Sequence, residues 1–355
     1  MTKFSSEREW VAWLEQRHRP PVGGRGIGDD CALLPLRAGW QLAATTDWFL
    51  EGVHFRRSER PQDCGYRLAM RALSDLAAMG AKPRALLLSA AWPRNIGWDW
   101  RRRLHAGLEQ AAREAGAPLI GGDLARASQV GFDIVGLGQI RRGRALLRTG
   151  GRPGDRLWVS GWLGYAAWGR QLAGRPNSRR PGQPSAAWRR AQRTERRRAI
   201  ERWRRPRARW ELGQRLSQPG YAHAALDLSD GLSSDLDRLC RASRVGAVIQ
   251  AERLPAPPLP AAAGNASRLS RRALKSAISA RPSRRALALA LDGGEDYELL
   301  FAAPLSASAR LRRLSSAALP LTEIGVLTRE PGIWLEENGH RRAMIPRGWD
   351  AFRKT

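Results

Sequence analysis

The chain has 355 residues, 43% of them hydrophobic, and a formal net charge of +28. This length predicts two domains, because single cores rarely grow beyond about 250–300 residues. The charge predicts affinity for polyanions such as nucleic acid, membrane surfaces or phosphate-rich ligands.

Compartment is indicated by what the sequence lacks. No uninterrupted apolar run is long enough to span a bilayer, and residues 1–20 show no signal-peptide core. Cys31, Cys64 and Cys240 are odd in number and scattered, which argues against a disulfide framework and a CxxC zinc site. We therefore expect a cytoplasmic protein.

The first 34 residues predict a short amphipathic helix over 4–18, which Pro20-Pro21 ends. The loop GGRGIGDD (23–30) follows, and its glycines would let the backbone approach a phosphate. Two adjacent aspartates would repel a bare phosphate, so they make sense if metal ions lie between carboxylate and phosphate. A flexible turn is the alternative.

The stretch AATTDWFLEGVHF (43–55) organises the first half of the chain. It predicts a strand that ends at Thr45-Thr46-Asp47 and a second short strand over 53–55. Hard cations such as Mg²⁺ take oxygen ligands, which a strand-end carboxylate and two hydroxyls supply. A strand with an ordinary Thr/Asp turn is the alternative.

The rest of the first half predicts alternating helices and strands, namely helices over 61–80 and 98–116 and strands over 84–92, 118–120 and 132–140, with a loop at 121–123. Asp75 lies within the apolar stretch of the first helix, where a carboxylate is costly unless it is paired or binds a metal. A solvent-facing Asp75 is the alternative. Gly121-Gly122-Asp123 repeats the pattern of glycines followed by an aspartate.

A Gly- and Pro-rich stretch at 148–155 predicts the domain boundary, with a strand over 156–160 behind it. Residues 174–210 are dominated by Arg with Pro, Ser and Trp, which predicts a disordered first third and a surface helix over 194–205. Arg with interleaved Trp is typical of nucleic-acid or phosphate binding, although a solvated insertion is the favoured interpretation.

Two later stretches carry further polar groups. In LDLSDG (226–231) a strand that ends in Asp227-Leu228-Ser229-Asp230-Gly231 runs into a helix. The helix N-terminus favours a nearby anion, and a capped helix start is the alternative. Residues 268–291 predict a helix, and DGGEDYELLF (292–301) predicts a Gly-rich turn and a strand. Near the C-terminus, Trp349 is suited to stack on a flat ring, with a packed tail as the alternative.

These aspartates are too many for one general acid/base pair, and they suit several divalent ions that neutralise a nucleotide triphosphate. Neither a P-loop nor the protein-kinase motif set is present. A phosphoryl-transfer enzyme of neither class can work by positioning and charge neutralisation.

The chain resembles the thiamine-monophosphate kinase family of the aminoimidazole-ribotide-synthetase-like superfamily. The resemblance implies that ATP phosphorylates thiamine monophosphate to thiamine diphosphate. It also implies an α+β fold of two domains and a homodimer formed through the N-terminal sheet. The motifs that carry it are GIGDDCALL (26–34), TTDWFLEGVHF (45–55), ALSDLAAMGAKP (72–83), LIGGD (119–123), LRTGGRPGD (147–155), LDLSDGLSSDL (226–236) and GGEDYELLF (293–301).

The same resemblance assigns residues 1–150 to an ATP- and Mg²⁺-binding, dimer-forming α/β domain. It assigns 151–355 to an α/β domain that completes the site and carries the Arg-rich insertion at about 174–210. The family often has a Tyr near the nucleotide where this chain has Glu114-Ala115, which leaves the adenine contact open.

The resemblance also implies roles for individual residues. The residues that would hold several Mg²⁺ ions are Asp30, Thr45, Thr46, Asp47, Asp75, Asp123, Asp227 and Asp230. The residues that would contact ATP are Gly122, Asp123, Arg148 and Ser229, and those that would contact thiamine monophosphate are His54, Glu295 and Trp349.

Two alternatives remain. A sister ATP-dependent synthetase of the superfamily would act on a ribotide, selenide or a carbamoyl group, but EGVHF (51–55) and Trp349 argue against it. A basic nucleic-acid-binding protein rests on the charge of +28 and the Arg-rich insertion.

Overall fold

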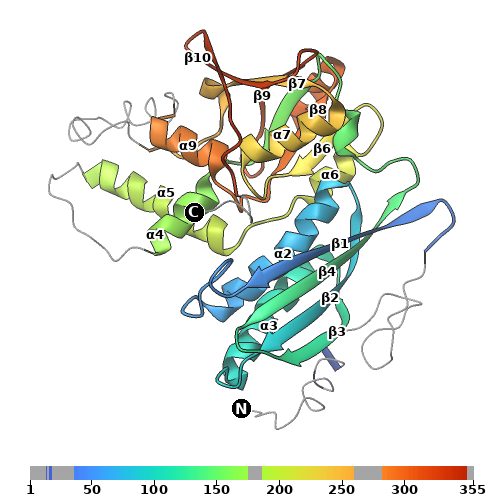
Figure 1. Cartoon of the computed structure of the whole chain (residues 1–355), viewed down its shortest axis with the longest axis vertical. Helices are drawn as coiled ribbons and strands as arrows, with labels where there is room; N and C mark the ends of the chain where they lie inside the picture. The colour runs from blue at the N-terminus through green and yellow to red at the C-terminus, as the bar shows by residue number, and fades with distance from the viewer. Residues whose placement is uncertain (1–12, 14–15, 18–35, 175–185, 260–281, 350–355) are drawn as a thin grey trace. The chain divides into compact units, whose positions relative to one another are not determined.

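The computed structural model describes residues 13, 16–17, 36–174, 186–259 and 282–349 (Figure 1), with the backbone alone for 186–192. The chain divides into two compact units, residues 1–145 with 208–217 and residues 146–207 with 218–355. In the described ranges no helix is long and apolar enough to cross a bilayer.

The first unit is a sheet covered by helices on one face. Over its described residues, four strands take the order β1-β4-β2-β3, in which β2 and β3 are parallel and the other pairs antiparallel. Helices α2 and α3 pack against this sheet and enclose the core. The elements are β1 (Trp40–Leu50), α2 (Pro61–Ala78), β2 (Lys82–Trp92), α3 (Trp98–Ala115), β3 (Leu119–Arg126) and β4 (Gly131–Arg141).

The helices predicted over 61–80 and 98–116 are confirmed to within about two residues. Pro61 stands in the first turn of α2, where its missing N–H costs nothing, and Gly116 ends α3 in the left-handed conformation. The two helices cross closely, since a Cβ on Gly107 would lie 1.9 Å from the carbonyl oxygen of Gln62. Glycine at 107 therefore sets the distance between α2 and α3.

Three predictions about strand ends were wrong. Thr45-Thr46-Asp47 lies inside β1, because the antiparallel ladder with β4 continues to Leu50. Residues 52–54 form a turn, in which the His54 N–H donates to the Leu50 carbonyl at 2.9 Å, and Phe55 forms an isolated bridge with Glu51. Gly121-Gly122-Asp123 likewise lies inside β3, whose pairing with β2 runs on to Arg126.

The second unit contains a mixed sheet. Its described residues form seven strands in the order β11-β10-β7-β9-β5-β8-β6, with β10 and β7 the parallel pair. Together with the first sheet it confirms the α+β class. The strands are β5 (Arg156–Ser160), β6 (Ala224–Asp227), β7 (Gly246–Gln250), β8 (Leu299–Ala303), β9 (Leu321–Thr328), β10 (Ile333–Glu337) and β11 (His340–Ala343). The helices that the text uses are α4 (Tyr165–Ala173), α5 (Ala186–Arg204), α7 (Leu232–Ser243) and α9 (Arg284–Asp292).

The Arg-rich segment is packed where it is described, which corrects the interpretation as a solvated insertion. Helix α5 lies beside α4 (Figure 1), and a Cβ on Gly169 would meet the Ala199 carbonyl oxygen at 2.0 Å. Ala199 and Trp203 are buried. Apolar residues recur three and four positions apart in this basic run, which gives α5 a face to bury.

The segment also returns to the first unit. Helix α6 (Trp210–Leu216) packs on α2, where a Cβ on Gly213 would lie 1.9 Å from the Ala77 carbonyl oxygen. The second predicted domain ran unbroken from 151 to 355, so the structure differs from it at 208–217. The predicted disorder of the first third of the insertion lies largely outside the described residues, as do the loop 23–30 and most of the helices expected over 4–18 and 268–291.

Candidate functional site

The inner face of the first sheet carries a polar cluster between sheet and helix. Strand alternation turns Thr45 and Asp47 to the same side as buried Phe49, toward α2. The Thr45 hydroxyl donates to Oδ2 of Asp75 at 2.5 Å, and Arg71 Nη2 lies 3.1 Å from Oδ1 of Asp47. Arg71 and Asp75 stand one turn apart on α2. Asp75 is therefore half-buried and hydrogen-bonded rather than solvent-facing.

The charges in this cluster oppose one another. Burial raises the pKa of Asp47 to about 6, and the carboxylates of Asp75 and Asp133 add to the rise, whereas Arg71 lowers it. A cation near Asp47 would relieve that repulsion. The described cation beside Asp47 is Arg71, and binding of a metal ion at this cluster stays a prediction.

The outer face of the same sheet holds a different set. Cross-strand registers align Trp48, Asp133, Ser89 and Asp123 in one row across β1, β4, β2 and β3. The Thr46 hydroxyl donates to Oδ1 of Asp133 on this face. Thr46 and Asp123 therefore lie on the opposite side of the sheet from Thr45 and Asp47.

Sequence reasoning missed Asp133. The signal was present, because Asp133 alternates with buried Phe132 and Ile134 in the predicted strand over 132–140. The alternating pattern alone places the Asp133 side chain on the outer face of its strand. Only the pairing of β1 with β4 identified Thr46 as its partner.

His54 holds the turn after β1. Its Nδ1 accepts the Leu50 N–H at 3.0 Å, and its ring stacks on Phe49 with centroids 5.9 Å apart. Burial, with Arg71 and Arg67 nearby, lowers the pKa of His54 to about 4, so the ring is neutral at pH 7. The structure thus gives His54 a local role, and its contact with substrate stays a prediction.

The glycine predicted to contact ATP has a packing role. A Cβ on Gly122 would lie 1.9 Å from the Leu88 carbonyl oxygen, so any side chain there would push β3 away from β2. Its contact with ATP stays a prediction.

In the second unit, three stretches far apart in sequence come together. The N–H of Glu295 donates to the Ser229 carbonyl at 2.8 Å, and the N–H of Tyr297 donates to the Leu228 carbonyl at 3.0 Å. The N–H of Trp349 donates to the Asp230 carbonyl at 2.9 Å, and its side chain is 51% exposed. Backbone hydrogen bonds thus gather the predicted contacts Ser229, Glu295 and Trp349 around the turn 228–230.

Acidic groups surround the start of α7. Asp227 ends β6 and is buried, and Asp230 forms an ion pair with Arg238 Nη2 at 2.5 Å. Asp235, which sequence reasoning missed, accepts the Asp230 and Gly231 N–H groups at 3.1 and 3.0 Å. Burial, together with Asp230, raises the pKa of Asp235 to about 7. An acid in the first turn of the predicted helix was its signal.

Arg148 is exposed in a short 3-10 turn (Arg148–Gly150), and its carbonyl oxygen accepts the Ser243 hydroxyl of α7. Its guanidinium has the planar geometry that suits a phosphate, and the structure leaves it at the surface.

The aspartates fit a hard divalent cation by chemistry, since carboxylate and hydroxyl oxygens are what Mg²⁺ takes. Within the described ranges no group of three His, Cys, Asp or Glu side chains is placed to hold a metal ion. Asp30 lies outside those ranges. A complete coordination sphere would therefore need donors beyond these clusters, such as phosphate oxygens or water.

The raised pKa of Asp47 predicts a pH effect on stability. Folded Asp47 binds a proton more tightly than the unfolded chain does, so its contribution to the free energy of unfolding falls as pH rises from about 4 to about 6. Asp47→Asn removes this titration. Relative to Asp47→Asn, we expect the wild type to lose up to about 3 kcal/mol between pH 4 and pH 7, measured by urea unfolding without divalent ions. Exposed Asp99→Asn is the control, and a pH-independent difference would contradict the prediction.

Comparison with known proteins agrees with these motifs. The family model of AIR synthase related protein, N-terminal domain, matches residues 28–140, and the C-terminal domain model matches 152–336. Thiamine-monophosphate kinase of Haemophilus influenzae is 33% identical over 310 residues, covering 86% of this chain and 84% of that protein. The Escherichia coli K12 enzyme is 35% identical and covers 92% and 91%.

Solved structures give the same relation. A thiamine-monophosphate kinase from Stenotrophomonas maltophilia has a TM-score of 0.74 at 33% identity, covering 94% of this chain and 98% of that one. AaThiL complexed with AMPPCP and TMP has a TM-score of 0.69 at 27% identity and covers 99% of both chains. Escherichia coli HypE, a hydrogenase maturation protein, shares the fold alone, with a TM-score of 0.68 at 19% identity over 96% and 98%. By its sequence matches over most of its length, this chain belongs to the thiamine-monophosphate kinase family.

Proposed function

We propose that this protein transfers the γ-phosphoryl group of ATP to thiamine monophosphate, yielding ADP and thiamine diphosphate. The observation that carries the proposal is the convergence of Ser229, Glu295 and Trp349 around one turn of the second unit. The family resemblance implies that Ser229 contacts ATP and that Glu295 and Trp349 contact the acceptor. The AaThiL relative, complexed with AMPPCP and TMP, supports the same pair of ligands.

The chemistry explains which residues the chain uses. The acceptor is a phosphate monoester, so the attacking oxygen is already anionic and needs no general base. The difficulty is that two anions must approach, which makes charge neutralisation the main task. Divalent cations, when bound, supply that neutralisation. Asp47 and Asp75 of the first unit and Asp227 and Asp230 of the second are the described carboxylates that would hold them.

The other residues predicted to bind Mg²⁺ are not assigned to direct metal binding in this proposal. Thr45 binds Asp75 and would orient it, whereas Thr46 and Asp123 lie on the outer face of the first sheet. Asp30 lies outside the described residues. The number of Mg²⁺ ions and the cytoplasmic location expected from the sequence stay predictions.

The decisive test is acceptor-dependent turnover. With labelled ATP and Mg²⁺, the wild type should phosphorylate thiamine monophosphate and leave thiamine unlabelled, because thiamine lacks the anionic oxygen. Asp75→Asn should lower kcat by about 10²–10³-fold with an unchanged circular dichroism spectrum, because an amide is a neutral and weaker ligand. Asp99→Asn, at the exposed start of α3, should keep wild-type turnover. Labelling of thiamine, or full activity of Asp75→Asn, would exclude this mechanism.

Trp349 is proposed to stack on the cationic, ring-bearing end of the acceptor. Its backbone is tied to Asp230 while its side chain is half exposed, so an aromatic face is available at a fixed point. Trp349→Ala should raise the KM for thiamine monophosphate about 2- to 30-fold and leave the KM for ATP nearly unchanged, whereas Trp349→Phe should keep most of the affinity. Trp334→Ala, at another exposed tryptophan, is the matched control. An unchanged acceptor KM in Trp349→Ala would make the segment structural.

A homodimer is proposed through the outer face of the first sheet. The side chains of Leu42 and Trp48 are 47% and 60% exposed on that face, and exposed apolar residues grouped on one sheet surface mark an interaction site. A second copy of this chain is the occupant that the family resemblance indicates. The matched faces of a two-fold dimer would bury both sets of side chains.

Sedimentation equilibrium tests the dimer. The wild type should have twice the mass of one chain, and Leu42→Glu combined with Trp48→Glu should shift it to a monomer, because both charges would be buried in the interface. Trp334→Glu in the second unit should leave the dimer intact. A monomeric wild type, or a double variant that stays dimeric, would refute the proposed interface.

A further inference from the structure

The loop GGEDYE (293–298), which joins α9 to β8, is held in an unfavourable backbone conformation. Glu295 and Tyr297 have φ angles of 67° and 51°. Residues other than glycine rarely adopt this left-handed region. Such conformations persist when surrounding contacts determine them. Two of these contacts are the backbone hydrogen bonds to Ser229 and Leu228.

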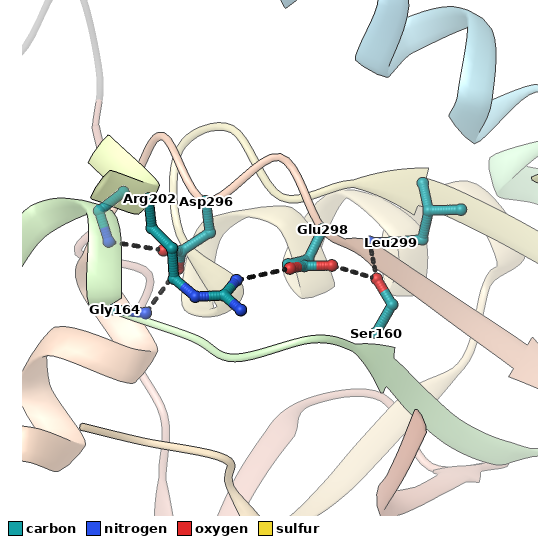
Figure 2. A network of polar contacts seen from close by, with 7 residues as sticks. Ser160, Gly164, Arg202, Asp296, Glu298 and Leu299 are labelled. Atoms are coloured by element: carbon teal, nitrogen blue, oxygen red, sulfur yellow. Dashed lines mark hydrogen bonds and ion pairs between the residues drawn. The ribbon is translucent and has the colours of Figure 1, made fainter. Parts of the chain in front are cut away.

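Asp296 and Glu298 of this loop form polar contacts with the start of α4, with β5 and with α5 (Figure 2). Asp296 accepts the Gly164 and Ala166 N–H groups at 2.5 and 3.1 Å, which caps the start of α4. Glu298 is 1% exposed and accepts the Ser160 hydroxyl at 2.6 Å. Ser160 in turn accepts the Leu299 N–H at 2.9 Å, so the loop is fixed to β5.

The cation of this network comes from the Arg-rich segment. Arg202 of α5 places Nη1 3.4 Å from Oε1 of Glu298 (Figure 2). Its guanidinium also lies 4.1 Å from the Trp162 ring centroid. The same helix is anchored nearby, because the Tyr165 hydroxyl donates to Glu195 at 2.8 Å. Arg202 is thus a partly exposed basic residue of the insertion that pairs with a buried carboxylate.

A second observation concerns Gly161, whose lack of a side chain makes room for the carboxylate of Glu298. A Cβ on Gly161 would lie 1.8 Å from Oε1 of Glu298, and Gly161 has a φ of 61°. Residue 161 therefore has no side chain where the carboxylate lies. A buried carboxylate is costly without a partner, and Arg202 supplies the compensating charge.

The two carboxylates and the guanidinium act on each other. Withdrawal from water raises the pKa of Asp296 to about 8; the two N–H donors lower it, Glu298 raises it and Arg202 lowers it. Loss of the Arg202 charge would remove the guanidinium that faces the buried carboxylate of Glu298. The loop would then lose part of what determines its left-handed conformation.

We propose that Arg202 is a positioning residue for acceptor binding, which fixes the loop carrying Glu295 by neutralising the buried Glu298 at the end of that loop. The inference rests on the proposed function, because Glu295 is the loop residue assigned to thiamine monophosphate. It gives the Arg-rich segment a role in the active site rather than in polyanion binding.

The test uses the full-length protein and a matched pair of variants. Arg202→Gln should raise the KM for thiamine monophosphate about 10-fold or more, with a change in the KM for ATP of less than about 2-fold, because a displaced loop misplaces one substrate. Arg198→Gln, one turn earlier and 65% exposed, should behave like the wild type. Arg202→Lys should restore much of the affinity, since it keeps the charge and loses the planar fork.

A double variant separates charge from packing. Arg202→Gln with Glu298→Gln should bind the acceptor better than Arg202→Gln alone, because the uncompensated carboxylate is gone. If Arg202→Gln does not fold, Arg202→Lys and this double variant carry the test. An acceptor KM within about 2-fold of wild type in every folded Arg202 variant would overturn the proposal.

Hydrogen exchange gives a readout that does not depend on turnover. In Arg202→Gln the amides of 293–298 should exchange about 10-fold faster, while those of 104–112 in α3 keep their protection. Unchanged exchange at 293–298 would refute the positioning role. Failure of the proposed function would be seen separately, as a wild type without acceptor-dependent turnover.

Discussion

The structure depends on keeping carboxylates partly out of water without leaving them uncompensated. Asp47 is neutralised by Arg71, Asp235 by Arg238, and Glu298 by Arg202. A carboxylate withdrawn from water is costly without a charged partner, so each guanidinium stabilises the carboxylate beside it. In the first unit this leaves Asp47 with a raised pKa, a state that binding of a cation would relieve.

Strand alternation gives these charges their geometry. Because successive side chains of β1 point to opposite faces, neighbouring Thr45 and Thr46 bind different acids, Asp75 on α2 and Asp133 on β4. A stretch that reads as one cluster in sequence is thus two clusters in space. The inner one is shielded between sheet and helix, where a charge has more electrostatic effect than at the surface.

The arginine content has a similar double character. A net charge of +28 favours binding of polyanions, and the densest run of arginines lies at 174–210. Helix α5 nonetheless buries Ala199 and Trp203 and directs Arg202 at Glu298. A basic composition therefore does not by itself indicate a solvated, ligand-binding face. An arginine of such a run can instead pair with a buried carboxylate, as Arg202 does with Glu298.

Local sequence was enough for helices α2 and α3, for several strands and for the family. Pro61 and Gly116 mark helix ends by their own backbone chemistry, and the motifs from 45 to 301 follow the family order. Three things needed the tertiary structure. Strand β1 continues past Asp47 because β4 pairs with it; Asp133 becomes the partner of Thr46; and Arg202 reaches Glu298 across 96 positions. Propensity and periodicity act over a few residues, whereas pairing and charge compensation depend on which distant segments the fold brings together.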